Sequence, residues 1–173
     1  MIIKILLSGD GGQGIQLMSD IICRSAVEQG FFVSHIPNYG LEQRGGVSLA
    51  FIQISDGEIA YPKFSKPDLL LVMSEQAGER TRQYQIADCP DVKYGIPTLR
   101  RDRLQVAEYR ELLEKNNIPS QSYNIFFLGL IAKMLEEKKI VTSKEVLRLL
   151  EEKLGGKPNW EENKKAFELV KSL

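Results

Sequence analysis

The chain contains 173 residues, of which 43% are hydrophobic and 27% are charged. It can therefore bury one sizeable core, and we expect a single domain over residues 1–173. Lysine plus arginine and aspartate plus glutamate both number 23. Because this balance provides no overall basic field of the kind that draws proteins to nucleic acid or anionic lipid, we expect neither a nucleic-acid partner nor a membrane partner.

Cysteine and histidine are scarce in this sequence. Cys23 and Cys89 are the only two cysteines; they are too few for a disulfide framework and too far apart for a paired metal site, which favours a reducing compartment. His35 is the only histidine. The sequence therefore cannot form a metal site that needs two histidines, and it offers only one candidate for the histidine of a Ser-His-Asp triad. The N-terminal apolar run is interrupted by Lys4 and ends in glycines, unlike a signal peptide or a membrane span. We therefore expect a cytoplasmic protein.

The first 36 residues predict a strand, a helix and a second strand. Residues 2–7 form a short apolar run that is typical of a strand buried on both faces. A glycine loop with the sequence Ser-Gly-Asp-Gly-Gly-Gln-Gly follows over residues 8–14. Residues 15–29 repeat apolar side chains at helical spacing, and Gly30 supplies the stop. Residues 31–36 predict the second strand of a βαβ unit with a right-handed crossover.

The middle of the chain predicts further strands. Residues 37–46 form a polar, glycine-rich connection at the carboxyl end of the second strand, where ligand sites of open α/β sheets collect. Residues 47–54 alternate large apolar with small or polar side chains, and a turn then leads into residues 58–61, so we predict a hairpin between these two segments. Residues 69–73 predict a buried strand, after which Ser74 can cap a helix over residues 75–84.

Helices dominate the last third of the sequence. Helical patterns cover residues 105–117, 122–132, 142–155 and 160–173. The segment over residues 122–132 is apolar on nearly all sides, which predicts burial on more than one face. Thr142 has the position of a capping residue. The fold class expected from these elements is α/β, with a mostly parallel Rossmann-like sheet flanked by helices, an antiparallel hairpin and a helical C-terminal third.

The glycine loop has the composition of an anion site. Glycine permits positive φ and lets a ligand approach the backbone N–H groups at the positive end of the following helix. Phosphate is the usual ligand of such a site. The same glycines also suit a tight strand-to-helix turn that binds nothing.

Two cofactors could use such a loop in a stand-alone Rossmann-like protein. Gly9, Gly11 and Gly14 match the dinucleotide pattern G-x-G-x-x-G, but Ser34-His35-Ile36 stands where an NAD site needs an acidic residue and an NADP site an arginine. Gly9-Asp10-Gly11 followed by Asn38 is similar to the magnesium-binding pattern of thiamine-diphosphate proteins, in which Asp10 and Asn38 would be metal ligands. Pro37 stands where that pattern often has a second asparagine.

A longer series of motifs joins the loop to the rest of the chain. The series is Gly11-Gly12-Gln13-Gly14, Pro37-x-Tyr39-Gly40-x-Glu42-x-Arg44-Gly45-Gly46, Ser55-Asp56 with Tyr61-Pro62, Pro67-Asp68, and Asn124 with Leu128-Gly129. In this order and spacing the sequence resembles the γ subunit of the 2-oxoacid:ferredoxin oxidoreductases, which act on pyruvate, 2-oxoglutarate, ketoisovalerate or indolepyruvate.

The resemblance implies one subunit of an enzyme. In that family a 2-oxoacid is oxidatively decarboxylated on thiamine diphosphate, the acyl unit passes to coenzyme A, and electrons leave through iron–sulfur clusters to ferredoxin. The expected partners are the α and β subunits, and in some complexes a δ subunit. Thiamine diphosphate, magnesium and the iron–sulfur clusters are expected on those partners, because a cluster needs about four thiolates and this chain has two cysteines. A non-catalytic interaction module is the remaining alternative.

The resemblance also implies which residues face the shared active site. Contact with coenzyme A is expected from the loop backbone, the Gln13 side chain and the glycine-rich connection. The expected binding residues are Gly9, Gly11, Gly12, Gln13, Gly14, Tyr39, Gly40, Arg44, Gly45 and Gly46. Arg44 suits a carboxylate or phosphate, or an ion pair with Glu42. Asp10 occupies a variable position of the family motif, and no catalytic residue and no metal ligand is assigned to this chain.

Overall fold

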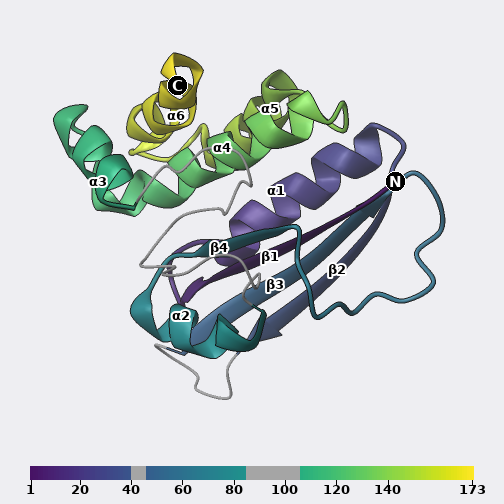
Figure 1. Ribbon diagram of the computed structural model, residues 1–173. Helices are drawn as coiled ribbons and strands as arrows, with labels where there is room; N and C mark the ends of the chain where they lie inside the picture. The colour runs from purple at the N-terminus through teal and green to yellow at the C-terminus, as the bar shows by residue number, and fades with distance from the viewer. Residues whose placement is uncertain (40–45, 85–105) are drawn as a thin grey trace.

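The computed structural model describes residues 1–39, 46–84 and 106–173 (Figure 1). Residues 40–45 and 85–105 lie outside this description, and so does the unassigned segment of the sequence over residues 86–102. The strands are β1 (Ile2–Asp10), β2 (Phe32–Tyr39), β3 (Val47–Ser55) and β4 (Leu69–Val72). The helices are α1 (Ile15–Glu28), α2 (Glu75–Thr81), α3 (Val106–Lys115), α4 (Tyr123–Glu137), α5 (Ser143–Leu154) and α6 (Trp160–Leu169).

The described strands form one mixed sheet in the order β2-β3-β1-β4. β4 runs parallel to β1, whereas β3 is antiparallel to both β1 and β2. Strands β1, β2 and β4 therefore point the same way, but β3 lies between β1 and β2 and is antiparallel to both. The sheet is thus mixed, and the prediction of a mostly parallel sheet is wrong in this respect. The α/β class, the flanking helices and the helical C-terminal third are confirmed.

The antiparallel hairpin is present at a different place from the predicted one. β2 and β3 pair from Phe32 with Ser55 to Tyr39 with Ser48. The predicted pairing of residues 47–54 with residues 58–61 is wrong, because residues 58–61 lie outside the strands. Both edges of β3 are already occupied by β1 and β2, so no backbone ladder is open to the later segment. A side chain makes that contact instead, since Gln53 Nε2 donates to the Tyr61 carbonyl at 2.9 Å.

The two faces of the sheet carry different helices. Figure 1 shows α1 and the layer of C-terminal helices on one side of the sheet and α2 on the other. Ile5 and Leu7 of β1 join the main core with α1 and α4, whereas Leu6 joins a smaller core with α2. This alternation follows from the two-residue period of a strand. The prediction that β1 is buried on both faces is confirmed.

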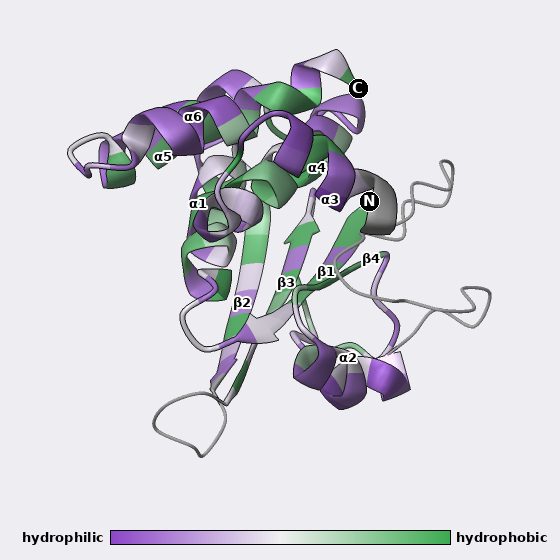
Figure 2. Cartoon of the chain, turned by 90° about the vertical axis from the view of Figure 1, so that its left-hand side faces the viewer, coloured by the Kyte–Doolittle hydropathy of each residue, from purple (hydrophilic) through white to green (hydrophobic). Residues whose placement is uncertain are grey.

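The C-terminal helices pack around α4. Its buried positions surround the helix, and a methyl group on Gly129 would lie 2.9 Å from the carbonyl oxygen of Phe167 on α6. The close approach of α4 and α6 therefore requires glycine. Figure 2 shows α4 as largely hydrophobic, the strands as bands of hydrophobic and hydrophilic residues, and much of α5 and α6 as hydrophilic. Among the described residues, no helix is both long enough and apolar enough to cross a lipid bilayer.

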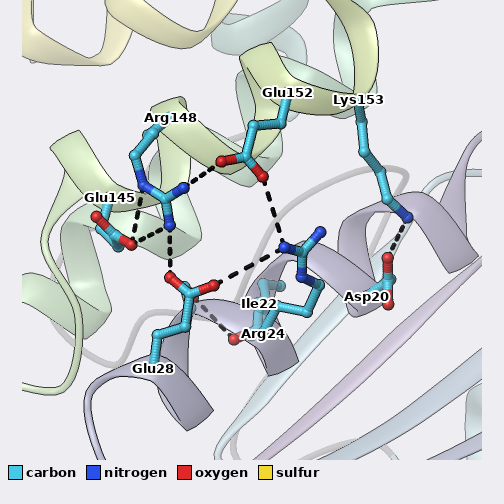
Figure 3. A network of polar contacts seen from close by, with 9 residues as sticks. Asp20, Ile22, Arg24, Glu28, Glu145, Arg148, Glu152 and Lys153 are labelled. Carbon is cyan, nitrogen blue, oxygen red and sulfur yellow. Dashed lines mark hydrogen bonds and ion pairs between the residues drawn. The ribbon is translucent and has the colours of Figure 1, made fainter.

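A network of exposed ion pairs ties α5 to α1 (Figure 3). Arg148 of α5 contacts Glu28, while Arg24 of α1 contacts Glu152. The Arg148 guanidinium also lowers the pKa of Glu145 to about 2. Exposed pairs of this kind stabilise weakly, so the network sets the position of α5 more than it strengthens the fold.

Candidate functional site: the glycine loop

The turn between β1 and α1 covers residues 11–14, because β1 continues through Ser8, Gly9 and Asp10, three residues that the sequence places in the glycine loop. β1 ends at Asp10 and α1 begins at Ile15. Gly12 has a φ of 96° and Gly14 a φ of 76°, a region that disfavours side chains. Among the residues that the structure describes, none lies within 4 Å of a Cβ atom placed on Gly12, and Gly12 is exposed. The loop is thus an exposed turn whose shape depends on glycine.

The Gln13 side chain holds the loop in shape. Its Oε1 accepts a hydrogen bond from the Asp10 backbone N–H at 2.7 Å, and its Nε2 donates to the Met73 carbonyl at 3.3 Å. The Gln13 backbone N–H also donates to the Asp10 carbonyl at 3.0 Å. Both polar ends of this amide are therefore engaged within the chain. Gln13 positions the loop against the end of β4, a role that the sequence does not reveal.

Asp10 is tied to α2. Its carboxylate accepts a hydrogen bond from Ser74 Oγ at 2.6 Å, and the same Oγ caps α2 by accepting from the Ala77 N–H at 3.1 Å. Asn38 lies on β2, with β3 between it and the strand of Asp10. At about 4.8 Å per strand the two backbones lie on the order of 10 Å apart. The thiamine alternative needs these two side chains on one magnesium ion, and the structure does not bring them together.

The glycine-rich connection reaches the loop where the structure describes it. The Gly11 N–H donates to the Gly46 carbonyl at 2.9 Å, and Gln16 Nε2 donates to Ser48 Oγ at 2.9 Å. The expectation that Gly46 lies at the same edge as the loop is confirmed. Tyr39 ends β2, and its side chain lies outside the description. The predicted residues Gly40, Arg44 and Gly45 also lie outside the described residues.

The start of α4 packs against the glycine loop. Asn124, in the first turn of α4, is 9% exposed. A Cβ atom on Gly14 would lie 2.3 Å from Asn124 Nδ2. The Asn124 side chain thus stands directly against the N-terminus of α1. From the sequence, Asn124 suggests only a helix cap, because nothing local indicates that α4 starts beside the loop.

The N-terminus of α1 offers free backbone donors. Gly14 is its N-cap, without a side-chain cap, and no acidic residue occupies the first turn. Within residues 1–39, 46–84 and 106–173, no backbone acceptor is found for the N–H groups of Gly12, Gly14, Ile15, Gln16 and Leu17. These donors and the helix dipole make the site suitable for a negatively charged group.

His35 and Cys23 lie away from the loop. Burial lowers the pKa of His35 on β2, with Asp20 acting in the opposite direction. Burial raises the pKa of Cys23 on α1 to about 12, and Asp20 adds to this effect. The raised pKa keeps the Cys23 thiol protonated at neutral pH, so it is not a nucleophile.

The sheet, the glycine loop and the uncapped helix define an α/β domain in which the N-terminus of α1 is suited to an anion. A family model described as pyruvate ferredoxin/flavodoxin oxidoreductase matches residues 4–172. The chain therefore belongs to this family, and the resemblance found in the sequence is confirmed.

The chain is similar in sequence to subunits of named 2-oxoacid enzymes. It is 43% identical over 75 residues to the 2-oxoglutarate synthase subunit KorC of Methanothermobacter marburgensis, a match covering 43% of this chain and 40% of the relative. It is 42% identical over 78 residues to KorC of Methanocaldococcus jannaschii, covering 44% and 42% of the two chains. Pyruvate synthase subunit PorC of M. marburgensis is 35% identical over 75 residues, covering 42% of each chain. The matched part is thus less than half of each relative.

Solved structures share the fold. The γ subunit of a keto/oxoacid ferredoxin oxidoreductase from Geobacter sulfurreducens aligns with 98% of this chain and 94% of its own, at 21% identity and a TM-score of 0.67. The 2-oxoglutarate:ferredoxin oxidoreductase of Magnetococcus marinus, solved with 2-oxoglutarate, coenzyme A and succinyl-CoA bound, aligns with 99% of this chain and 31% of its own. Its identity is 19% and its TM-score is 0.67.

Proposed function

We propose that this chain is the γ subunit of a 2-oxoacid:ferredoxin oxidoreductase. The complex oxidatively decarboxylates a 2-oxoacid, forms an acyl-CoA and passes the electrons to ferredoxin. Family membership over residues 4–172 supports this proposal, as do the KorC and PorC subunits among the relatives. The chain acts as one γ-type domain, together with α, β and in some complexes δ subunits, in the cytoplasm.

The partner subunits hold the redox cofactors in this proposal. Two cysteines cannot supply the four or so thiolates of an iron–sulfur cluster. The Asp10 carboxylate is bonded to Ser74, and among the described residues no group of three or more histidine, cysteine or acidic side chains could hold a metal ion. The residues present here thus fit neither a cluster nor the magnesium of thiamine diphosphate. On the partner chains, thiamine diphosphate would supply the carbanion chemistry and the iron–sulfur clusters would supply electron transfer.

The role of this chain is to complete the coenzyme A region. One observation carries this part of the proposal: the uncapped N-terminus of α1, with its free N–H groups, beside the open position of Gly12. A diphosphate would accept hydrogen bonds from these groups and would compensate the positive end of the helix. Gly11 lets the backbone approach, and Gln13 keeps the loop in position. Gly9 is buried in β1, where a Cβ atom would lie 2.7 Å from Gln13 Oε1, and a Cβ atom on Gly14 would lie 2.3 Å from Asn124 Nδ2. These two glycines therefore make room for neighbouring side chains rather than for a ligand. Gly46, whose carbonyl accepts from the Gly11 N–H at 2.9 Å, adjoins this site. In this proposal Tyr39, Gly40, Arg44 and Gly45 are further binding residues.

A pair of glycine variants tests the coenzyme A contact. Gly12 and Gly30 have φ angles of 96° and 85°, and a Cβ on either meets nothing within 4 Å. Gly12→Ala and Gly30→Ala therefore carry a similar backbone penalty, but only the first places a methyl group in the proposed site. In the reconstituted complex, Gly12→Ala should raise the KM for coenzyme A about tenfold, equivalent to about 1.4 kcal/mol.

The KM for the 2-oxoacid should stay within about twofold of the parent value in both variants, since that substrate reacts on partner chains. Equal KM values for coenzyme A in the Gly12→Ala and Gly30→Ala complexes would contradict the proposed contact.

A further inference from the structure

The Asn124 side chain is placed as a donor over the glycine loop. Asn124 lies in the first turn of α4 and is 9% exposed. Its Nδ2 stands 2.3 Å from the position that a Cβ of Gly14 would occupy. The first turn of α4 thus lies beside the start of α1, at the same end of the molecule (Figure 1). The amide and the free N–H groups of α1 share one small region.

The orientation of this amide is fixed by its neighbour. The Ile125 backbone N–H donates to Asn124 Oδ1 at 2.9 Å. Oδ1 must therefore be the acceptor and Nδ2 the donor. No acceptor for Nδ2 is found among the residues that the structure describes. In that same part of the chain, His35 Nε2 is the fully buried side-chain atom without a partner, so Asn124 Nδ2 retains contact with the molecular surface.

A nearly buried amide with one satisfied end and one free donor has lost most of its water on folding. Because Nδ2 itself still reaches the surface, it can exchange its remaining water for an acceptor that a ligand supplies. The N-terminus of α1 lies next to Asn124 Nδ2 and carries backbone N–H donors that also lack acceptors. Several donors that lie in one region without acceptors are suited to an anionic oxygen from outside the chain.

We propose that Asn124 is a ligand-binding residue whose Nδ2 donates to a phosphoryl oxygen of the anion seated on the glycine loop. This inference rests on the proposed function, in which that anion is the diphosphate of coenzyme A. The glycine at position 14 then has two roles. It adopts the positive φ of the N-cap, and it leaves the room that the Asn124 amide occupies.

The substitution Asn124→Asp tests the donor with little change of shape. An aspartate can still accept from the Ile125 N–H, but its second oxygen repels a phosphoryl group instead of donating to it. In the reconstituted complex we expect the KM for coenzyme A to rise by at least about tenfold, because hydrogen bonds to charged groups are among the stronger ones. The KM for the 2-oxoacid should remain within about twofold of the parent.

Asn163→Asp is the matched control. Asn163 lies on α6, is 3% exposed, and accepts from Ser122 Oγ at 2.8 Å, a bond that aspartate can keep. It should leave the KM for coenzyme A within about twofold. If Asn124→Asp does not assemble into the complex, Asn124→Ser replaces the amide by a shorter hydroxyl that does not reach the position of Nδ2, without adding charge, and it should raise that KM at least about fivefold.

The outcomes separate this inference from the proposed function. If Asn124→Asp and Asn124→Ser leave the KM for coenzyme A unchanged while Gly12→Ala raises it, the loop binds coenzyme A and the role given to Asn124 is wrong. If none of the three raises it, both proposals fail. A parallel rise in the KM for both substrates would show a structural role for Asn124 and would also overturn the inference.

Discussion

Gly14→Ala should destabilise the folded chain more than Gly12→Ala does. The φ of 76° at this position carries a penalty of about 1–2 kcal/mol for a residue with a Cβ. The new methyl group would also lie 2.3 Å from Asn124 Nδ2 and 3.4 Å from its Cγ. Overpacking of this kind adds about 1–3 kcal/mol. The expected loss of about 2–5 kcal/mol is a large part of a typical unfolding free energy of about 5–15 kcal/mol.

Urea unfolding of the purified chain measures this loss. Gly12→Ala is the control, because it has the same kind of φ, 96°, but no atom within 4 Å of its Cβ. It should therefore show the backbone penalty of about 1–2 kcal/mol without the clash. In the double variant Gly14→Ala/Asn124→Ala the amide is gone, so the unfolding free energy should exceed the additive value by about 1–3 kcal/mol.

Two results would refute this reasoning. One is a loss in Gly14→Ala no larger than the loss in Gly12→Ala. The other is additivity of Gly14→Ala and Asn124→Ala, which would show that the two residues do not compete for the same space.

Three further predictions concern the surroundings of the loop. Ser74→Ala removes the cap of α2 and the partner of Asp10, and should lower the unfolding free energy by about 1 kcal/mol in urea; no change would contradict the role of that hydroxyl. In a Cys89→Ser background, Cys23 should react slowly with a thiol reagent at about pH 8 until urea is added, because burial raises its pKa to about 12. Burial lowers the pKa of His35 below 6.5, so the unfolded chain binds more protons below that pH. The unfolding free energy should fall from about pH 6.5 toward about pH 5, and His35→Gln should flatten this slope; an unchanged slope would argue against it.

Local patterns were sufficient to predict most elements of the fold. The apolar run over residues 2–7 and that over residues 69–73 correspond to β1 and β4, and helical spacing placed α1 within a residue of its end. Thr142 accepts a hydrogen bond from the Glu145 N–H at 3.2 Å, which confirms its interpretation as a cap. These features depend on the period of side chains and on caps, both of which are encoded within a few residues.

The position of β3 could not be predicted in this way. Alternation over residues 47–54 identifies a strand, but the same pattern suits any neighbour in a sheet. The insertion of β3 between β1 and β2 depends on long-range pairing, from Ile2 with Ser55 to Asp10 with Val47. The following turn suggested a hairpin with residues 58–61, and the sequence contains no sign that both edges of β3 are occupied.

The candidate site, like the fold, could be predicted from the sequence only in part. The glycine loop and its neighbour Gly46 could be placed together, because both follow strands that end at one edge of the sheet. The roles of Gln13 and Asn124 could not, since each depends on contacts with a distant segment: Gln13 with Met73 on the far side of the loop, and Asn124 with Gly14. Polar residues whose partners are far away in the sequence carry no local signature.

The central claim is that the loop and the first turn of α1 contact coenzyme A in the assembled enzyme. Amide hydrogen exchange on the complex, with and without coenzyme A, tests this claim most directly. The account predicts that exchange at Gly12, Gly14 and Ile15 slows about tenfold or more when coenzyme A binds, because these N–H groups gain acceptors, while exchange near Gly30 does not change. Unchanged exchange over residues 11–17 in a complex saturated with coenzyme A would contradict it.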